Sequence, residues 1–210
     1  MKKYDLIENY LEELFPNPKC ELNYFNDYSL LISIMLSAQT TDKKVNEVTK
    51  VLFSKYTSLK ELKEANIKDL ETIIHPLGNY HKKSYNVKEI ARILYDEYNS
   101  LVPNKRDVLE TFPGVGRKTV NVFFAEYLNI PAIAVDTHVE RVCKRLRLAK
   151  EKDNVLEIEK KLMKNIKKEN WCKRHLQLVL FGRYHCKAIK PECETCKLKD
   201  ICNVTSKEKL

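Results

Sequence analysis

The stretch Phe112-Pro113-Gly114-Val115-Gly116-Arg117-Lys118 lies between two segments whose apolar residues recur at helical spacing. Pro113 ends the first segment, and the two glycines permit a tight turn with positive φ and close backbone approach. The amides of Gly114, Val115 and Gly116 would then project beyond the N-terminus of the next helix, where the helix dipole favours an anion. The turn predicts a site for a DNA backbone phosphate; an ordinary connection between two helices is the alternative.

Arg117 and Lys118 open the helix that follows this turn. We expect Arg117 to contact DNA together with the three amides. Lys118 would face the positive end of the helix dipole, which disfavours a charged ammonium, and a neutral amine is what nucleophilic attack requires. Because the chain has 38 Lys and Arg residues, a plain solvated lysine is the alternative for Lys118.

Asp136 stands in Val135-Asp136-Thr137-His138, after a short apolar run and before a helical segment. Aspartate is among the best N-cap residues, so a structural role is expected. A capping carboxylate is held rigidly and stays ionised, so it could also stabilise positive charge that develops on a sugar. The two roles are compatible.

Helical spacing of apolar residues extends over almost the whole chain, and no alternation typical of a β-strand persists. The sequence therefore predicts an all-α fold. Asp27, Ser58 with Glu61, and Asp136 are expected to start helices. The expected helices cover residues 7–14, 28–37, 42–52, 58–61, 66–74, 81–98, 107–112, 116–128, 136–148, 154–166 and 170–185.

Composition limits the partners and the compartment. The 210 residues carry a net charge of +9, which suits a polyanion, although a lysine-rich solvated surface would give the same value. The longest purely apolar runs are a few residues, far short of the roughly 20 that a membrane span needs. We expect a protein without an export signal or membrane contact, soluble and cytoplasmic.

Four of the seven cysteines crowd the C-terminal segment. Cys186, Cys193, Cys196 and Cys202 are separated by six, two and five residues. In a chain without an export signal, this clustering indicates a four-thiolate metal site in preference to disulfides. Zinc and a four-iron cluster both accept four thiolates, so the spacing alone leaves the metal open.

Several separated motifs together resemble the endonuclease III family of helix–hairpin–helix DNA glycosylases, over nearly the whole chain. They are Leu36-Ser37-Ala38-Gln39-Thr40-Thr41-Asp42, the hairpin from Phe112 to Lys118, Ala134-Val135-Asp136-Thr137-His138, Phe181-Gly182-Arg183-Tyr184 and the cysteine segment. The resemblance implies that the four cysteines hold a [4Fe-4S] cluster.

The same resemblance implies two helical lobes beside a DNA-binding cleft: a six-helix barrel domain at residues 21–131, and a cluster domain from residues 1–20 and 132–210. It implies a bifunctional enzyme that removes oxidised pyrimidines and then cleaves the strand 3′ to the abasic site by β-elimination. Lys118 would form a Schiff base, Asp136 would stabilise the cationic sugar, and Ser37, Asp42 and Arg183 would line or support the cleft.

The implied partner is double-stranded DNA with damaged bases or abasic sites, bound by a monomer associated with the nucleoid of a prokaryote. Gln39 matches the residue that fills the gap left by an everted base, and a polar residue at a helix end is its plainer alternative. Asn79 is expected to contact DNA where the family often has an apolar wedge, with intercalation weakened or supplied by Leu77 or Tyr80.

Two alternatives remain at this point. A mismatch-specific relative would break only the glycosidic bond and would generally lack the hairpin lysine. A non-catalytic iron–sulfur protein that binds DNA would keep the hairpin and the cysteines without needing Lys118 and Asp136 together.

Overall fold

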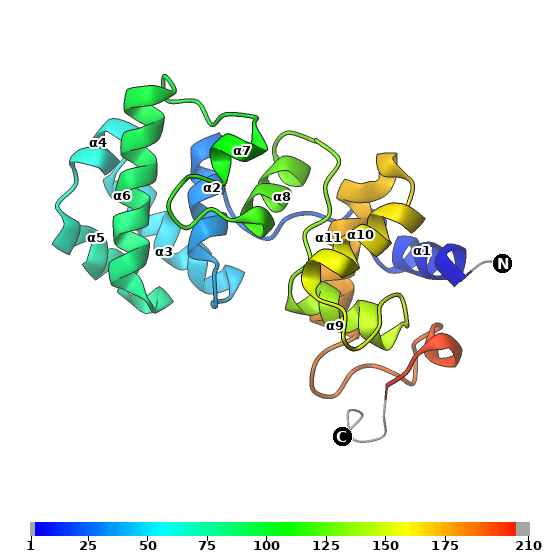
Figure 1. The fold of residues 1–210 in the computed structure, drawn as a ribbon. Helices are drawn as coiled ribbons and strands as arrows, with labels where there is room; N and C mark the ends of the chain where they lie inside the picture. Colours follow the sequence, from blue (N-terminus) through cyan, green and yellow to red (C-terminus); the bar gives the residue numbers. More distant parts are fainter. Residues whose placement is uncertain (1–2, 205–210) are drawn as a thin grey trace. The chain divides into compact units, whose positions relative to one another are not determined.

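The computed structural model describes residues 3–204 (Figure 1), and this part of the chain contains helices, turns and coil but no β-strand. The all-α prediction is confirmed. None of the described helices is long and apolar enough to cross a membrane. The chain divides into two compact units: Cys20–Leu128 form one, and the residues of Met1–Lys19 and Asn129–Leu210 that the structure describes form the other.

The helices follow the expected order along the chain. The α-helices are α1 (Lys3–Leu14), α2 (Asp27–Leu36), α3 (Asp42–Lys55), α4 (Leu59–Glu64), α5 (Ile67–Ile74), α6 (Tyr80–Glu97), α7 (Arg106–Leu109), α8 (Arg117–Glu126), α9 (Thr137–Arg145), α10 (Val155–Asn165) and α11 (Trp171–Leu180). Short 3₁₀ turns are η1 (His75–Leu77), η2 (Lys168–Asn170) and η4 (Lys199–Ile201), and η3 (Phe181–His185) is a π-helical turn that continues α11.

Side-chain caps set several of these starts, and two differ from expectation. The expected cap of α2 by Asp27 is wrong, since Asn26 caps the helix in a capping box with Ser29. Asp27 instead accepts a 2.8 Å hydrogen bond from the backbone N–H of Val102. Ser58 caps α4 as expected, but the Glu61 carboxylate accepts from Thr57 and not from the cap residue. A short polar side chain one residue earlier can serve the same orphan amides, which is why spacing alone misplaces such caps.

Helix α2 forms the centre of the Cys20–Leu128 unit. All of its residues from Tyr28 to Leu36 are buried, which fits a helix that is apolar nearly all round. It packs against α3, α6 and α8, while α6 also packs along α4 and α5 (Figure 1). The hairpin between α7 and α8 is therefore anchored on the most buried helix of its unit.

The second unit has its own core, to which α1, α9, α10 and α11 contribute. Helix α11 packs against α1 and α9, and η3 packs against α9 (Figure 1). Leu11, Val142, Leu162, Phe181 and Leu198 are among its buried residues. The N-terminal helix and the C-terminal segment thus share one core.

Candidate functional site

The hairpin is a tight turn whose residues have distinct tasks. The N–H of Val115 donates a 3.0 Å hydrogen bond to the carbonyl of Phe112, with Pro113 second and Gly114, at φ 77°, third in the turn. These are the residues that a type II turn favours at those positions. Phe112 and Val115 are buried, and the N–H of Val115 is engaged within the turn, so the expected contact between this amide and a phosphate is not open in this structure.

Gly116 corrects one expectation about the turn. It is the N-cap of α8 with φ −108° and ψ −177°, which is extended backbone that any residue can adopt. Only Gly114 has the positive φ that was expected of both glycines. A β-carbon on Gly116 would meet no heavy atom within 4 Å, so glycine here leaves open space beside the first amides of α8.

Arg117 and Lys118 occupy the first two positions of α8, and both side chains are exposed. Lys118 therefore stands directly after the turn, in the first turn of a helix that carries no acidic residue there. The unpaired amides of that first turn carry partial positive charge. This end of α8 therefore combines partial positive charge on its backbone with an accessible amine.

Asp136 is the N-cap of α9, as predicted. Its Oδ1 atom accepts a 2.8 Å hydrogen bond from the N–H of Val139, and the residue is half-buried. The next turn of α9 is tied to η3, because Arg141 donates to the carbonyl of Gly182 at 2.6 Å and to that of Cys186 at 3.2 Å. The carboxylate is therefore fixed on a helix that is itself braced by η3, which carries Arg183.

Gln39 and Asn79 lie in two exposed turns of the Cys20–Leu128 unit. Both adopt the left-handed region, with φ 58° at Gln39 and 47° at Asn79. Leu77 is buried, which contradicts the alternative in which Leu77 supplies the intercalation. The ring of Tyr80 lies between those of His75 and His81, at centroid distances of 4.5 and 4.1 Å.

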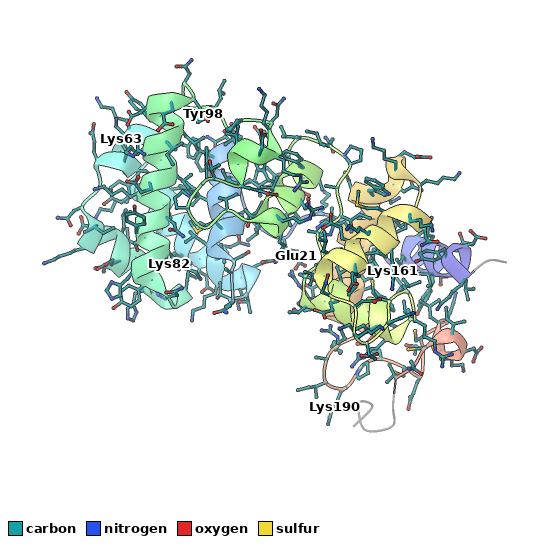
Figure 2. All side chains as sticks on the ribbon, viewed as in Figure 1. Glu21, Lys63, Lys82, Tyr98, Lys161 and Lys190 are labelled. Carbon is teal, nitrogen blue, oxygen red and sulfur yellow. The ribbon has the colours of Figure 1, made fainter. Side chains whose placement is uncertain are left out.

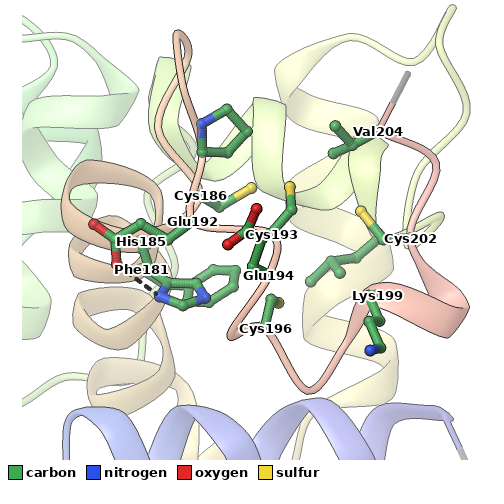
Figure 3. Close-up of a pocket in the computed structure, with 12 residues that line it drawn as sticks. Phe181, His185, Cys186, Glu192, Cys193, Glu194, Cys196, Lys199, Cys202 and Val204 are labelled. Atoms are coloured by element: carbon green, nitrogen blue, oxygen red, sulfur yellow. Dashed lines mark ion pairs between the residues drawn. The ribbon is translucent and has the colours of Figure 1, made fainter. Parts of the chain in front are cut away.

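The four C-terminal cysteines line one pocket of about 340 Å³ (Figure 3). Cys186 is buried, the other three are partly exposed, and all four are free thiols. Phe181, Leu146 and Val204 contribute apolar wall. Burial raises the pKa of the Cys186 and Cys196 thiols. Within residues 3–204 no three potential ligands lie close enough together to hold a single metal ion.

Arg145 bonds to the start of the cysteine segment, at Cys186, Lys187 and Ala188, although the sequence pattern did not single it out. The side chain is 5% exposed. Its guanidinium donates to the carbonyls of Lys187 at 2.6 Å and Ala188 at 3.2 Å, and to the sulfur of Cys186 at 3.4 Å. Its position three residues after Val142, on the apolar side of α9, was the signal that could have identified a buried arginine.

Lys83 is the second buried cation that sequence reasoning missed. It is 5% exposed in α6, and its ammonium donates to the carbonyls of Ala38 and Leu77. Helical spacing places it on one face with Val87, Ile90 and Leu94, all of them buried. A lysine within such an apolar face was the available signal.

The chain is similar to known DNA repair proteins over most of its length. Residues 32–168 match the HhH-GPD superfamily base excision DNA repair proteins. Endonuclease III of Bacillus subtilis (strain 168) is 43% identical, with 96% of this chain and 92% of the relative aligned. Endonuclease III of Escherichia coli (strain K12) is 41% identical, with 94% and 93% aligned.

Solved structures give the same result. A trapped covalent endonuclease III–DNA intermediate, an estranged-adenine complex, has a TM-score of 0.91 and 45% identity, with 97% of this chain and 96% of that chain covered. A thermostable thymine-DNA glycosylase has a TM-score of 0.81 at 22% identity, which shows likeness of fold alone. The chain is a member of the endonuclease III family within the HhH-GPD superfamily.

Proposed function

We propose that this protein is a bifunctional DNA glycosylase and abasic-site lyase of base excision repair that acts on oxidised pyrimidines in double-stranded DNA. The observation that carries the proposal is the hairpin, which presents an exposed amine at Lys118, in the first turn of α8, beside the open space at Gly116. Relatives 41–43% identical over nearly the whole chain are endonuclease III enzymes. One related structure is a covalent intermediate trapped on DNA, and covalent chemistry of that kind needs a nucleophile.

Binding begins with the DNA backbone. The N–H of Val115 already bonds to the carbonyl of Phe112, so the amides of Gly114 and Gly116 and the dipole of α8 would hold one phosphate. Arg117 would add a charge-assisted contact. Such contacts fix the register of the protein on the duplex without reading sequence. The damaged nucleotide must then leave the base stack, at a cost of about a few kcal/mol, before its C1′ atom can be reached.

Lys118 would carry the covalent step. Its neutral Nζ attacks C1′, the glycosidic bond breaks, and the base leaves with the bonding electron pair. Opening of the sugar ring gives a protonated Schiff base between Nζ and C1′. Loss of a proton from C2′ then expels the 3′ phosphate by β-elimination, which breaks the strand 3′ to the lesion, and hydrolysis releases the lysine.

Asp136 would stabilise the positive charge that develops on the sugar as the base departs. The cap to Val139 uses Oδ1 and holds the carboxylate in place, so no reorganisation is needed when the charge appears. We propose that Lys118 and Asp136 act on the same nucleotide. Gln39 and Asn79 would fill the space that the everted nucleotide leaves.

We further propose that Cys186, Cys193, Cys196 and Cys202 hold a [4Fe-4S] cluster. The thiol set fits such a cluster, because four sulfurs line one largely apolar pocket and Arg145 donates an N–H to one of them. When bound, the cluster would supply a rigid cross-link among four points of a segment whose helical structure is the short turn η4.

Borohydride reduction during reaction with abasic-site or thymine-glycol DNA tests the function. The unaltered protein should form a stable covalent adduct, which Lys118→Ala should abolish. Lys60→Ala, which removes an exposed lysine on α4, should leave it unchanged. Base release without an adduct would identify a monofunctional glycosylase, and DNA binding with neither reaction would identify a non-catalytic protein. Either result would overturn the proposal.

A further inference from the structure

Helix α6 carries a buried lysine whose ammonium bonds to two backbone carbonyls. The side chain of Lys83 is 5% exposed, and its Nζ atom donates to the carbonyl oxygens of Ala38 at 2.9 Å and Leu77 at 3.0 Å. Both acceptors are neutral, so they offset the loss of water less completely than a carboxylate would. Burial accordingly lowers the pKa of Lys83. An apolar residue at this position would avoid that cost.

The two acceptors belong to different turns, distant in sequence. Ala38 directly precedes Gln39, in the turn after α2, and Leu77 lies two residues before Asn79, in the turn before α6. One ammonium therefore joins two loops. Ala38 precedes Lys83 by 45 residues and Leu77 precedes it by 6. Both loops are short, so a displacement of either carbonyl would be passed on to the neighbouring exposed side chain.

The exposed residues Gln39 and Asn79 both have an uncommon backbone conformation. Gln39 has φ 58° and Asn79 has φ 47°, and the residue before Asn79, Gly78, has φ 68°. Non-glycine residues in the left-handed region persist where surrounding structure fixes them, and they cluster at ligand-binding loops. In both loops the buried ammonium bonds to a carbonyl one or two residues away from the left-handed position.

We propose that Lys83 is a positioning residue that holds the Gln39 turn and the Asn79 turn at a fixed separation, so that the two side chains enter the duplex together at an everted nucleotide. This inference rests on the function proposed above. It also gives a reason for the polar residue at Asn79. An apolar wedge tolerates small shifts, whereas two amides that hydrogen-bond to an orphaned base must reach it within about 2.7–3.2 Å.

The test compares Lys83→Met with Lys82→Met. Lys82, labelled in Figure 2 beside the first turns of α6, is an exposed neighbour whose replacement makes the same change in charge and volume. Cleavage is measured on two duplexes with a central abasic site. One has a normal base opposite, and the other has a tetrahydrofuran residue opposite, which removes the orphaned base.

The expected result is a loss confined to one substrate. Lys83→Met should lower kcat/KM about 10-fold or more on the duplex with a normal base opposite, since small misplacements of positioning groups have large effects. On the duplex without an orphaned base, the loss should be less than about threefold. Lys82→Met should change kcat/KM by less than about threefold on either duplex. Equal losses on both duplexes, or no loss on either, would overturn the proposal.

A double mutant keeps the proposal falsifiable if Lys83→Met folds poorly. Lys83→Gln retains one amide donor, and its effect should shrink when Gln39→Ala is also present, because the two residues act through the same loop. Additive effects would contradict the proposal. Failure of the proposed function would look different, since the unaltered protein would then cleave neither duplex.

Discussion

Gly114 and Asn86 lie so close together that a β-carbon on Gly114 would be 2.3 Å from the Nδ2 atom of Asn86. Asn86 is buried in α6, and the same β-carbon would lie 3.1 Å from Cγ of Met35 in α2. The hairpin turn therefore rests its backbone directly on two helices of the unit. Glycine is required there both by this contact and by its φ of 77°.

Gly114→Ala should consequently destabilise the protein, by about 1–3 kcal/mol, because alanine is strained at positive φ and has no room. Gly116→Ala is the matched control, since φ is −108° and the surroundings are open; it should cost less than about 1 kcal/mol. Its methyl group should instead weaken binding of abasic-site DNA by standing beside the phosphate-binding amides. Urea unfolding and a binding titration separate the two effects, and equal stabilities would show that the turn relaxes freely.

A second glycine contact joins η3 to α9. A β-carbon on Gly182 would be 2.8 Å from Cβ of His138 and 3.0 Å from its carbonyl oxygen. Neither atom can move by a side-chain rotation alone, so Gly182→Ala should push the two elements apart and cost about 1–3 kcal/mol. Thermal unfolding measures this loss. A variant as stable as the unaltered protein would mean that η3 and α9 are not in such close contact.

Arg145 and Arg147 offer a matched pair for the thiol pocket. Arg145 donates to the Lys187 and Ala188 carbonyls and to the sulfur of Cys186, whereas Arg147 is exposed and bonds to Asn203 at 3.0 Å. Lysine lacks the planar fork that serves several acceptors at once. With the proposed cluster bound, Arg145→Lys should therefore lose iron to a chelator about 10-fold faster than the unaltered protein, and Arg147→Lys should not. Iron content and visible absorption follow the loss; identical rates for both variants would contradict this role for Arg145.

The all-α fold and several helix starts could be predicted from the sequence because the relevant signals are local. Apolar spacing and capping patterns together located the α-helices of residues 3–204, and Asp136 and Ser58 were identified as N-caps. The predictions that were wrong also concerned single residues and their immediate neighbours. Asn26 replaced Asp27 as a cap because two adjacent polar residues compete for the same orphan amides. The extended backbone of Gly116 was not predicted, because a PGxG pattern does not say which of its two glycines takes the positive φ.

Tertiary burial explains what local signals could not supply. Leu77 is an apolar residue near a proposed DNA contact, yet the fold buries it, and only packing against other helices decides that. Lys83 and Arg145 are two of 38 cations in the sequence, and their carbonyl partners are backbone atoms from other segments. Backbone acceptors leave no trace in the pattern of side chains, so helical spacing could indicate that these two cations are buried but not what they bond to.

Asp136 allows its structural and chemical roles to be separated by substitution. Asparagine caps helices about as well as aspartate, whereas alanine costs about 0.5–2 kcal/mol. Asp136→Asn should therefore retain the hydrogen bond from the N–H of Val139 and the stability of the protein. Asp136→Ala should lose this hydrogen bond and lower the free energy of unfolding by that amount. A neutral amide cannot stabilise a cationic sugar, so both variants should release thymine glycol about 100-fold or more slowly in single-turnover reactions. If Asp136→Asn released the base at the normal rate, the carboxylate would be a helix cap and nothing more.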